Sequence, residues 1–152
     1  MARDLRQQIH ANAAELRRLR ACIEETLARR GRDRQAWRDA CAEFHTRYDA
    51  LAFPGGYEGA LERLVAGDLL TMEAALVFLE LRPYFFRSGY MHKKLMRYAK
   101  RAPFSQAQAQ RFRVVSQRAA DWRALKRERS DAMSLEDMFL FLERRGILRA
   151  RE

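Results

Sequence analysis

Two antiparallel helices joined by a short turn are predicted by residues 16–48, which read LRRLRACIEETLARRGRDRQAWRDACAEFHTRY. Large apolar residues recur at intervals of three or four on both sides of Gly31 and Asp33, which is the spacing of one helix face. Residues at one level of an antiparallel pair have numbers with a constant sum, and here the sums are 63 or 64. The facing pairs are Leu27 with Trp37, Ile23 with Cys41, Leu19 with Phe44 and Leu16 with Tyr48. We therefore expect helices over 3–30 and 34–52 to form a coiled-coil-like hairpin.

After the hairpin, a turn is predicted over 53–57, because Pro presets one backbone dihedral and the two glycines accept positive φ. A short helix follows over 57–66, and Gly67 ends it. The next helix, over 69–81, is capped by Asp68 or Thr71 and is apolar around most of its circumference. A helix of that kind is buried on all sides, so we expect it at the centre of the fold.

A basic, aromatic helix is predicted over 84–101, after Pro83 ends the central helix. The alternative is a later start at Ser88, which leaves 83–87 as a connector. If the helix begins at Tyr84, residues spaced by three and four form a face that points toward the core. Its members are Tyr84, Ser88, Met91, Leu95, Tyr98 and Ala102.

Two capping boxes predict the remaining helices. Ser105 with Gln108 opens a helix over 106–128. Ser134 with Asp137 opens a last helix, which ends before Gly146.

The whole chain has the composition of a compact helical protein. It contains 152 residues, of which 48% are hydrophobic, with only 7 Gly and 3 Pro. Such a chain can bury a core without cross-links, and no segment alternates with the period of a strand. We predict an all-α single-domain bundle of about seven helices over 1–152, with the hairpin (3–52) packed on the central helix and a bundle portion over 57–148.

Positive charge is concentrated in one part of the chain. The formal net charge is +10, and residues 82–129 contain fourteen basic and two acidic side chains. No Asp or Glu occurs over 81–120, whereas 51–81 contains five acidic residues and one basic residue. Because crowded like charges oppose folding, such a segment usually has an acidic counterpart within the protein or on a partner.

One outward stripe of the basic helix is the predicted binding site. Side chains spaced by three and four lie on one face of a helix, where cations and a tyrosine together suit a carboxylate-rich protein surface or phosphates. The predicted binding residues are Arg87, Tyr90, Lys93, Lys94, Arg97, Lys100 and Arg101.

Glu73 and Glu80 offer a competing use for the arginines. They lie seven residues apart and therefore share one face of the central helix. A pair of carboxylates can perform acid–base chemistry, or it can receive an arginine from a neighbouring helix, with Arg82 or Arg87 as the obvious donor. In the second case, part of the charge surplus is neutralised within the protein.

Metal binding is not predicted. His10, His45 and His92 are far apart in sequence, and Cys22 and Cys41 do not form a CxxC pair. The two cysteines fall at one level of the hairpin, so a disulfide is conceivable. We prefer two reduced, buried thiols, because a cytoplasmic location is expected.

The expected cytoplasmic location follows from the lack of a signal peptide and of a membrane-spanning run. The first ten residues, MARDLRQQIH, lack the apolar core of a signal peptide. The longest apolar run, Ala74–Leu79, is too short to span a bilayer.

Three functions are compatible with the sequence. The favoured one is a non-catalytic, bacterial-type intracellular binding protein of the antitoxin, immunity or adaptor kind, whose basic, aromatic face docks on an acidic protein. The second is a nucleic-acid binder that uses the same face, although no helix-turn-helix motif is present. The third is an enzyme that brings together Glu73, Glu80, Tyr90 and His92. No cofactor is expected.

Overall fold

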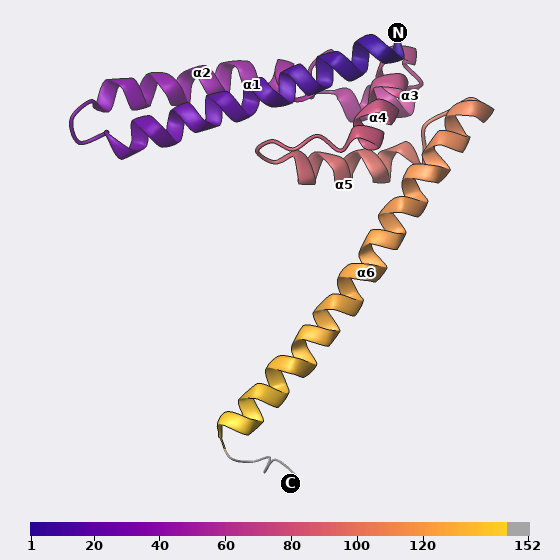
Figure 1. The fold of residues 1–152 in the computed structure, drawn as a ribbon. Coiled ribbons are helices and arrows are strands. Elements are labelled where there is room, and N and C mark those ends of the chain that lie inside the picture. The colour runs from indigo at the N-terminus through magenta and orange to yellow at the C-terminus, as the bar shows by residue number, and fades with distance from the viewer. Residues whose placement is uncertain (146–152) are drawn as a thin grey trace. The chain divides into compact units, whose positions relative to one another are not determined.

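The computed structural model describes residues 1–145, apart from the side chains of Met133 and Ser134. Six helices and no strand occur in this part of the chain, which confirms the predicted all-α fold (Figure 1). The helices are α1 (Ala2–Ala28), α2 (Arg34–Ala52), α3 (Ala60–Ala66), α4 (Leu69–Leu81), α5 (Ser88–Ala99) and α6 (Gln106–Arg144).

The chain divides into two compact units, Met1–Phe112 and Arg113–Glu152, with the boundary inside α6. Compact units are not necessarily separate domains, so the prediction of a single domain stays a prediction.

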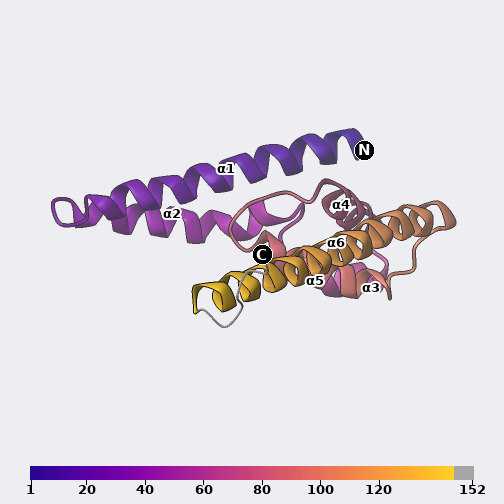
Figure 2. The same ribbon diagram turned by 60° about the horizontal axis from the view of Figure 1, so that its bottom comes forward.

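Helices α1 and α2 form the predicted antiparallel hairpin and lie side by side (Figures 1 and 2). Leu16, Leu19 and Phe44 are buried in its seam, whereas Leu27, next to the turn, is 39% exposed. Asp33 caps α2, because its carboxylate accepts a hydrogen bond from the backbone N–H of Ala36 at 3.0 Å. The seam is therefore tightest away from the turn.

The thiols of this hairpin differ from expectation in one respect. Cys22 and Cys41 are free, but each is half-buried instead of fully buried. They lie in the part of the hairpin nearer the turn, where the seam opens to solvent.

Helix α4 is the central helix, and α1, α3 and α5 all pack against it. The Asp68 carboxylate caps it by accepting hydrogen bonds from the backbone N–H and the hydroxyl of Thr71, at 2.9 and 2.6 Å. Every residue from Ala74 to Leu79 is buried. Its first turn is an exception to the expected all-round burial, since Leu69 is 76% exposed.

Helix α5 begins at Ser88, so the later of the two predicted starts is correct. The segment 82–87 is a connector. Tyr84 consequently does not belong to a helix face, and its side chain is 79% exposed instead of inward. Ser88, Met91 and Leu95 are buried as predicted.

Helix α6 is continuous where two helices were expected. The capping box at its start is confirmed, because the Ser105 and Gln108 side chains bond each other's backbone N–H at 3.2 and 3.1 Å. The expected break before Ser134 does not occur, since residues 129–133 contain neither Gly nor Pro to end a helix.

Within residues 1–145, no helix combines the length and the apolar content needed to cross a membrane.

Candidate binding surface

The seven predicted binding residues all lie on or beside α5, and every one of them is exposed. None forms an ion pair with another residue that the structure describes. We call them the α5 cationic face: Arg87, Tyr90, Lys93, Lys94, Arg97, Lys100 and Arg101.

The acidic residues of the central helix are occupied by other arginines. Arg111 donates one hydrogen bond to Glu73 at 2.7 Å and two to Glu80, at 2.7 and 3.1 Å. Arg6 of α1 also donates to Glu80, at 2.7 Å. The expected donors were Arg82 or Arg87, and the structure instead shows Arg6 and Arg111. The α5 cationic face therefore keeps its charge.

This cluster also changes the acidity of Arg111. The pKa of its guanidinium is raised, chiefly by its hydrogen bonds to Glu80 and then, against the opposing effect of burial, by its hydrogen bond to Glu73. Both carboxylates are largely buried, with side chains only 15% exposed. Charge-assisted hydrogen bonds of this kind tie the first turns of α6 to α4.

Aromatic rings contact several guanidinium groups of the face. The Arg101 guanidinium lies 4.7 Å from the centre of the Tyr98 ring, and that of Arg97 lies 6.0 Å from it. Arg87 lies over Phe86 at 5.6 Å. Such contacts favour defined positions for the side chains and leave their hydrogen-bond donors available to a ligand.

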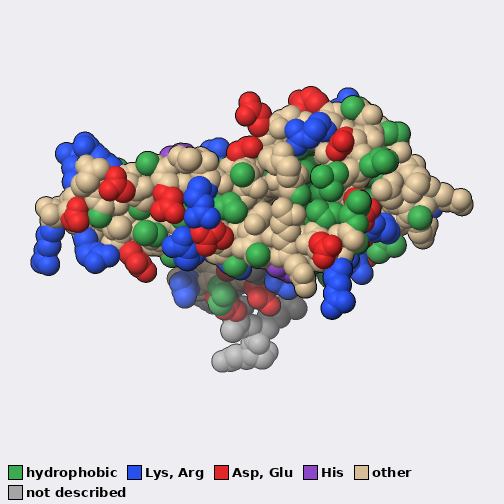
Figure 3. Space-filling model, turned by 90° about the horizontal axis from the view of Figure 1, so that it is seen from above, with side chains coloured by type: hydrophobic (Ala, Val, Ile, Leu, Met, Phe, Trp, Pro, Cys, Tyr) green, Lys and Arg blue, Asp and Glu red, His purple; other side chains and the backbone are tan. Residues whose placement is uncertain are grey.

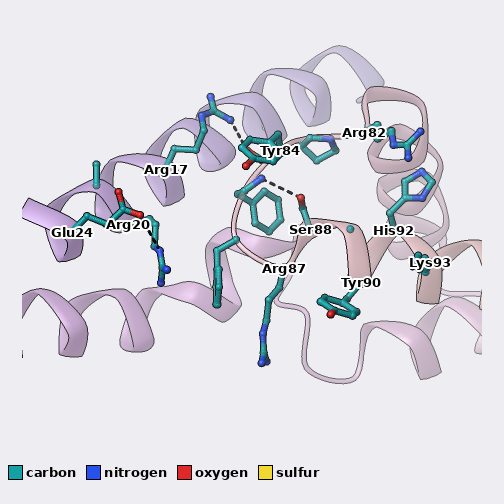
Figure 4. Close-up of a pocket in the computed structure, with 15 residues that line it drawn as sticks. Arg17, Arg20, Glu24, Arg82, Tyr84, Arg87, Ser88, Tyr90, His92 and Lys93 are labelled. Atoms are coloured by element: carbon teal, nitrogen blue, oxygen red, sulfur yellow. Dashed lines mark hydrogen bonds and ion pairs between the residues drawn. The ribbon is translucent and has the colours of Figure 1, made fainter. Parts of the chain in front are cut away.

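A pocket of about 910 Å³ adjoins the start of this face (Figure 4). Its walls come from α1, the connector 82–87 and the first turns of α5. Five cationic residues and one acidic residue line it, so its charge is strongly positive. They are Arg17, Arg20, Arg82, Arg87, Lys93 and Glu24.

Backbone acceptors hold the connector that forms this pocket. Arg17 donates a hydrogen bond to the carbonyl oxygen of Tyr84 at 2.8 Å, and the Tyr48 hydroxyl donates to that of Phe86 at 2.7 Å. At the start of α5, the Ser88 hydroxyl accepts a hydrogen bond from the backbone N–H of Phe85 at 3.1 Å. Both helices of the hairpin therefore position the connector.

The cationic side chains of the pocket do not converge on one point. Arg82 and His92 lie together, whereas Arg87 points away from them (Figure 4). The pKa of His92 is lowered, first by burial and then by the positive charge of Arg82, so the imidazole is neutral at neutral pH. This arrangement suits several contacts along an extended ligand better than a single small anion.

Arg82 and Arg87 have an uncommon backbone conformation. They are the non-glycine residues with positive φ among those described, at 48° and 67°. Both stand at the ends of the connector, where left-handed backbone costs about 1 kcal/mol for a residue that has a Cβ. The connector is therefore held in a strained shape by its contacts with the hairpin.

Only part of this site was predictable from the sequence. Three residues of the predicted stripe line the pocket, namely Arg87, Tyr90 and Lys93. The other four predicted residues lie farther along α5 or just beyond its end. Arg17 and Arg20 were missed, because no sequence pattern shows that the connector folds back on α1.

The residues of the enzymatic hypothesis do not share this pocket. Tyr90 and His92 line it, whereas Glu73 and Glu80 do not. Among the described residues, no group of three or more His, Cys, Asp or Glu side chains is placed to hold a metal ion.

Comparison with protein-family models, with curated proteins and with solved structures gives no match for this chain. The structure shows a helical-bundle protein.

Proposed function

We propose that this chain is a non-catalytic binding protein that docks on an acidic protein through the α5 cationic face and the adjoining pocket. The observation that supports this proposal is the division of charge. Glu73 and Glu80 are held by Arg6 and Arg111, while the α5 cationic face has no acidic partner among residues 1–145. A complementary partner supplies the missing negative charge.

The exposed aromatic residues favour a protein partner. Tyr84 is 79% exposed, Tyr90 is 70% exposed and Phe86 is 42% exposed, all of them at the pocket. Tyrosine and arginine are the side chains that most often anchor protein interfaces. The pocket offers a concave site for a side chain of the partner.

The neighbouring surface disfavours a polyphosphate chain. Glu24 lines the pocket with its carboxylate 3.6 Å from the Arg20 guanidinium, so part of the positive charge of the pocket is already neutralised. On the face of the molecule in Figure 3, acidic and basic side chains are interspersed along the hairpin, and basic ones gather at its turn. A mixed surface of this kind suits a protein partner with its own mixture of charges.

The proposed class is that of small intracellular antitoxin, immunity and adaptor proteins. Proteins of this kind act by covering or bridging a partner and need no catalytic group. The pocket contains no pair of carboxylates and no metal-binding cluster among the described residues, so binding alone accounts for its composition.

Affinity capture with a pair of charge-matched variants tests the proposal. The test variant is R97E/R101E, with one change on α5 and one just beyond its end, both outside the pocket. The control is R30E/R34E at the hairpin turn, which changes the net charge equally at exposed residues. We expect the wild type and the control to retain a stoichiometric acidic protein from nuclease-treated native lysate at low salt, and the test variant to lose it.

Two results would contradict the proposal. If the test variant and the control retain the same acidic protein equally, the α5 cationic face is only a solvated surface. If nuclease treatment removes all bound material, the partner is a nucleic acid.

Nucleic-acid binding is the second candidate, and the row of cations along α5 is the observation in its favour. In that case the affinity for single-stranded DNA falls steeply with salt, because binding releases counterions, and it changes little with sequence. A titration at several salt concentrations measures this slope directly.

A further inference from the structure

The helical part of the second unit, residues 113–144, has opposite charge in its two halves. Residues 113–129 contain six basic and two acidic side chains, a net charge of +4. Residues 130–144 contain one basic and four acidic side chains, a net charge of −3. At 1.5 Å per residue these halves are each about 24 Å long. The helix is therefore an extended electric dipole made of side chains.

The acidic half is also the most apolar. Between Leu135 and Phe141, five large apolar side chains are between 49% and 56% exposed. A single helix in water gains little stability by itself, and an exposed apolar patch usually marks an interaction site. The exposed side chains are Leu135, Met138, Phe139, Leu140 and Phe141.

Three acidic side chains of this helix have no basic partner among the described residues. Asp121 accepts a hydrogen bond from Gln117 at 2.8 Å. Glu128, Asp131 and Glu143 form no ion pair with any residue that the structure describes. Intrahelical pairing therefore does not explain the segregation of charge.

We propose that residues 113–144 pair with the same helix of a second copy of this chain, in antiparallel orientation. An antiparallel pair places the +4 half of each helix against the −3 half of the other, and twofold symmetry makes this contact twice. A parallel pair places like charges together. The backbone macrodipoles also favour the antiparallel arrangement.

The boundary between the two charged halves determines which residues of the two helices face each other. The division between the charged halves falls after Arg129, which places the twofold axis near this residue. Facing residues then have numbers that sum to about 258 and lie on one face of the helix, so that Met138 lies opposite Ala120, and Asp131 lies opposite Arg127. A large side chain therefore faces a small one at the first position, as close helix packing requires, and opposite charges face each other at the second.

The mass of the full-length protein in solution, measured by sedimentation equilibrium, is the first test. We expect a dimer at micromolar concentration, and a monomer for L135K/M138K, which places positive charge in the acidic half, opposite the basic half of the partner. The control is L69K/L70K, which places the same charges at exposed apolar residues at the start of α4 and should leave the dimer intact. Circular dichroism verifies that each variant keeps its helices. A monomeric wild type, or a dimer that survives L135K/M138K, would overturn the proposal.

Cross-linking of single cysteines tests the orientation, in a C22S/C41S background. R127C, near the axis and on the same face as Met138, should cross-link to itself through a short bis-maleimide. Q117C and L142C, on opposite sides of the axis, should cross-link to each other when the two chains are co-expressed, and neither should cross-link to itself. Self-cross-linking of Q117C shows a parallel pair and overturns the proposal. This site is independent of the α5 cationic face, so either proposal can fail without the other.

Discussion

Arg111 and Arg101 are ten residues apart in sequence and are used in opposite ways. Arg111 reaches two carboxylates of the central helix, with three hydrogen bonds of 2.7 to 3.1 Å. Arg101 lies exposed just beyond α5, with its guanidinium against the Tyr98 ring, 4.7 Å from its centre. Positive charge in this protein is therefore either paired with acidic residues within the fold or left exposed, and the position of the acidic residues distinguishes the two cases.

The largest effect on stability is expected at Arg111. Replacing it in R111A leaves Glu73 and Glu80 short of a donor in a largely buried environment, and hydrogen bonds to charged groups each contribute about 2 kcal/mol. We expect R111A to lower the free energy of unfolding in urea by about 2 kcal/mol or more. R101A should change it by less than about 0.5 kcal/mol. Equal losses for the two variants would contradict the division between them.

A smaller effect on the free energy of unfolding, of opposite sign, is expected when glycine replaces Arg87. Its backbone φ of 67° suits glycine, so R87G should raise the free energy of unfolding by about 0.5–1 kcal/mol. The matched change R97G, in the interior of α5, should lower it by about 1 kcal/mol. Thermal unfolding of both variants measures this difference. A destabilised R87G would show that its contact with Phe86 outweighs the backbone strain.

The smallest effect concerns pH. Hydrogen bonds from Arg18 and then Arg47 lower the pKa of Glu15 from 4.5 to about 2. Because the folded pKa lies below the ordinary value, Glu15 contributes stability above pH 4.5, and this contribution is lost as the pH falls toward 2. The free energy of unfolding of E15Q should therefore depend less on pH in this range than that of the wild type. An unchanged slope would show that this exposed cluster contributes nothing.

The local elements were predictable because short-range rules determine them. The register of the hairpin follows from two apolar stripes, and the starts of α2 and α4 follow from the capping carboxylates of Asp33 and Asp68. The exposure of the α5 cations likewise follows from helical spacing. Each of these predictions needs only residues that are close in sequence.

The pocket was not predictable, because it depends on contacts between distant residues. Arg17 and the Tyr84 carbonyl are 67 residues apart in sequence. The positive φ of Arg82 and Arg87 could not be predicted, because neither residue is a glycine. Tertiary packing also determines which arginine pairs with Glu73 and Glu80. The candidates nearer in sequence were wrong.

Capture of the partner by wild type, R97E/R101E and R30E/R34E, together with the unfolding free energy of each, tests most directly whether the α5 charges serve a partner. We predict that all three proteins are equally stable within about 0.5 kcal/mol. Only R97E/R101E should lose the nuclease-resistant acidic protein. Equal capture by the three proteins, or a large loss of stability in R97E/R101E, would contradict a binding role for the α5 cationic face.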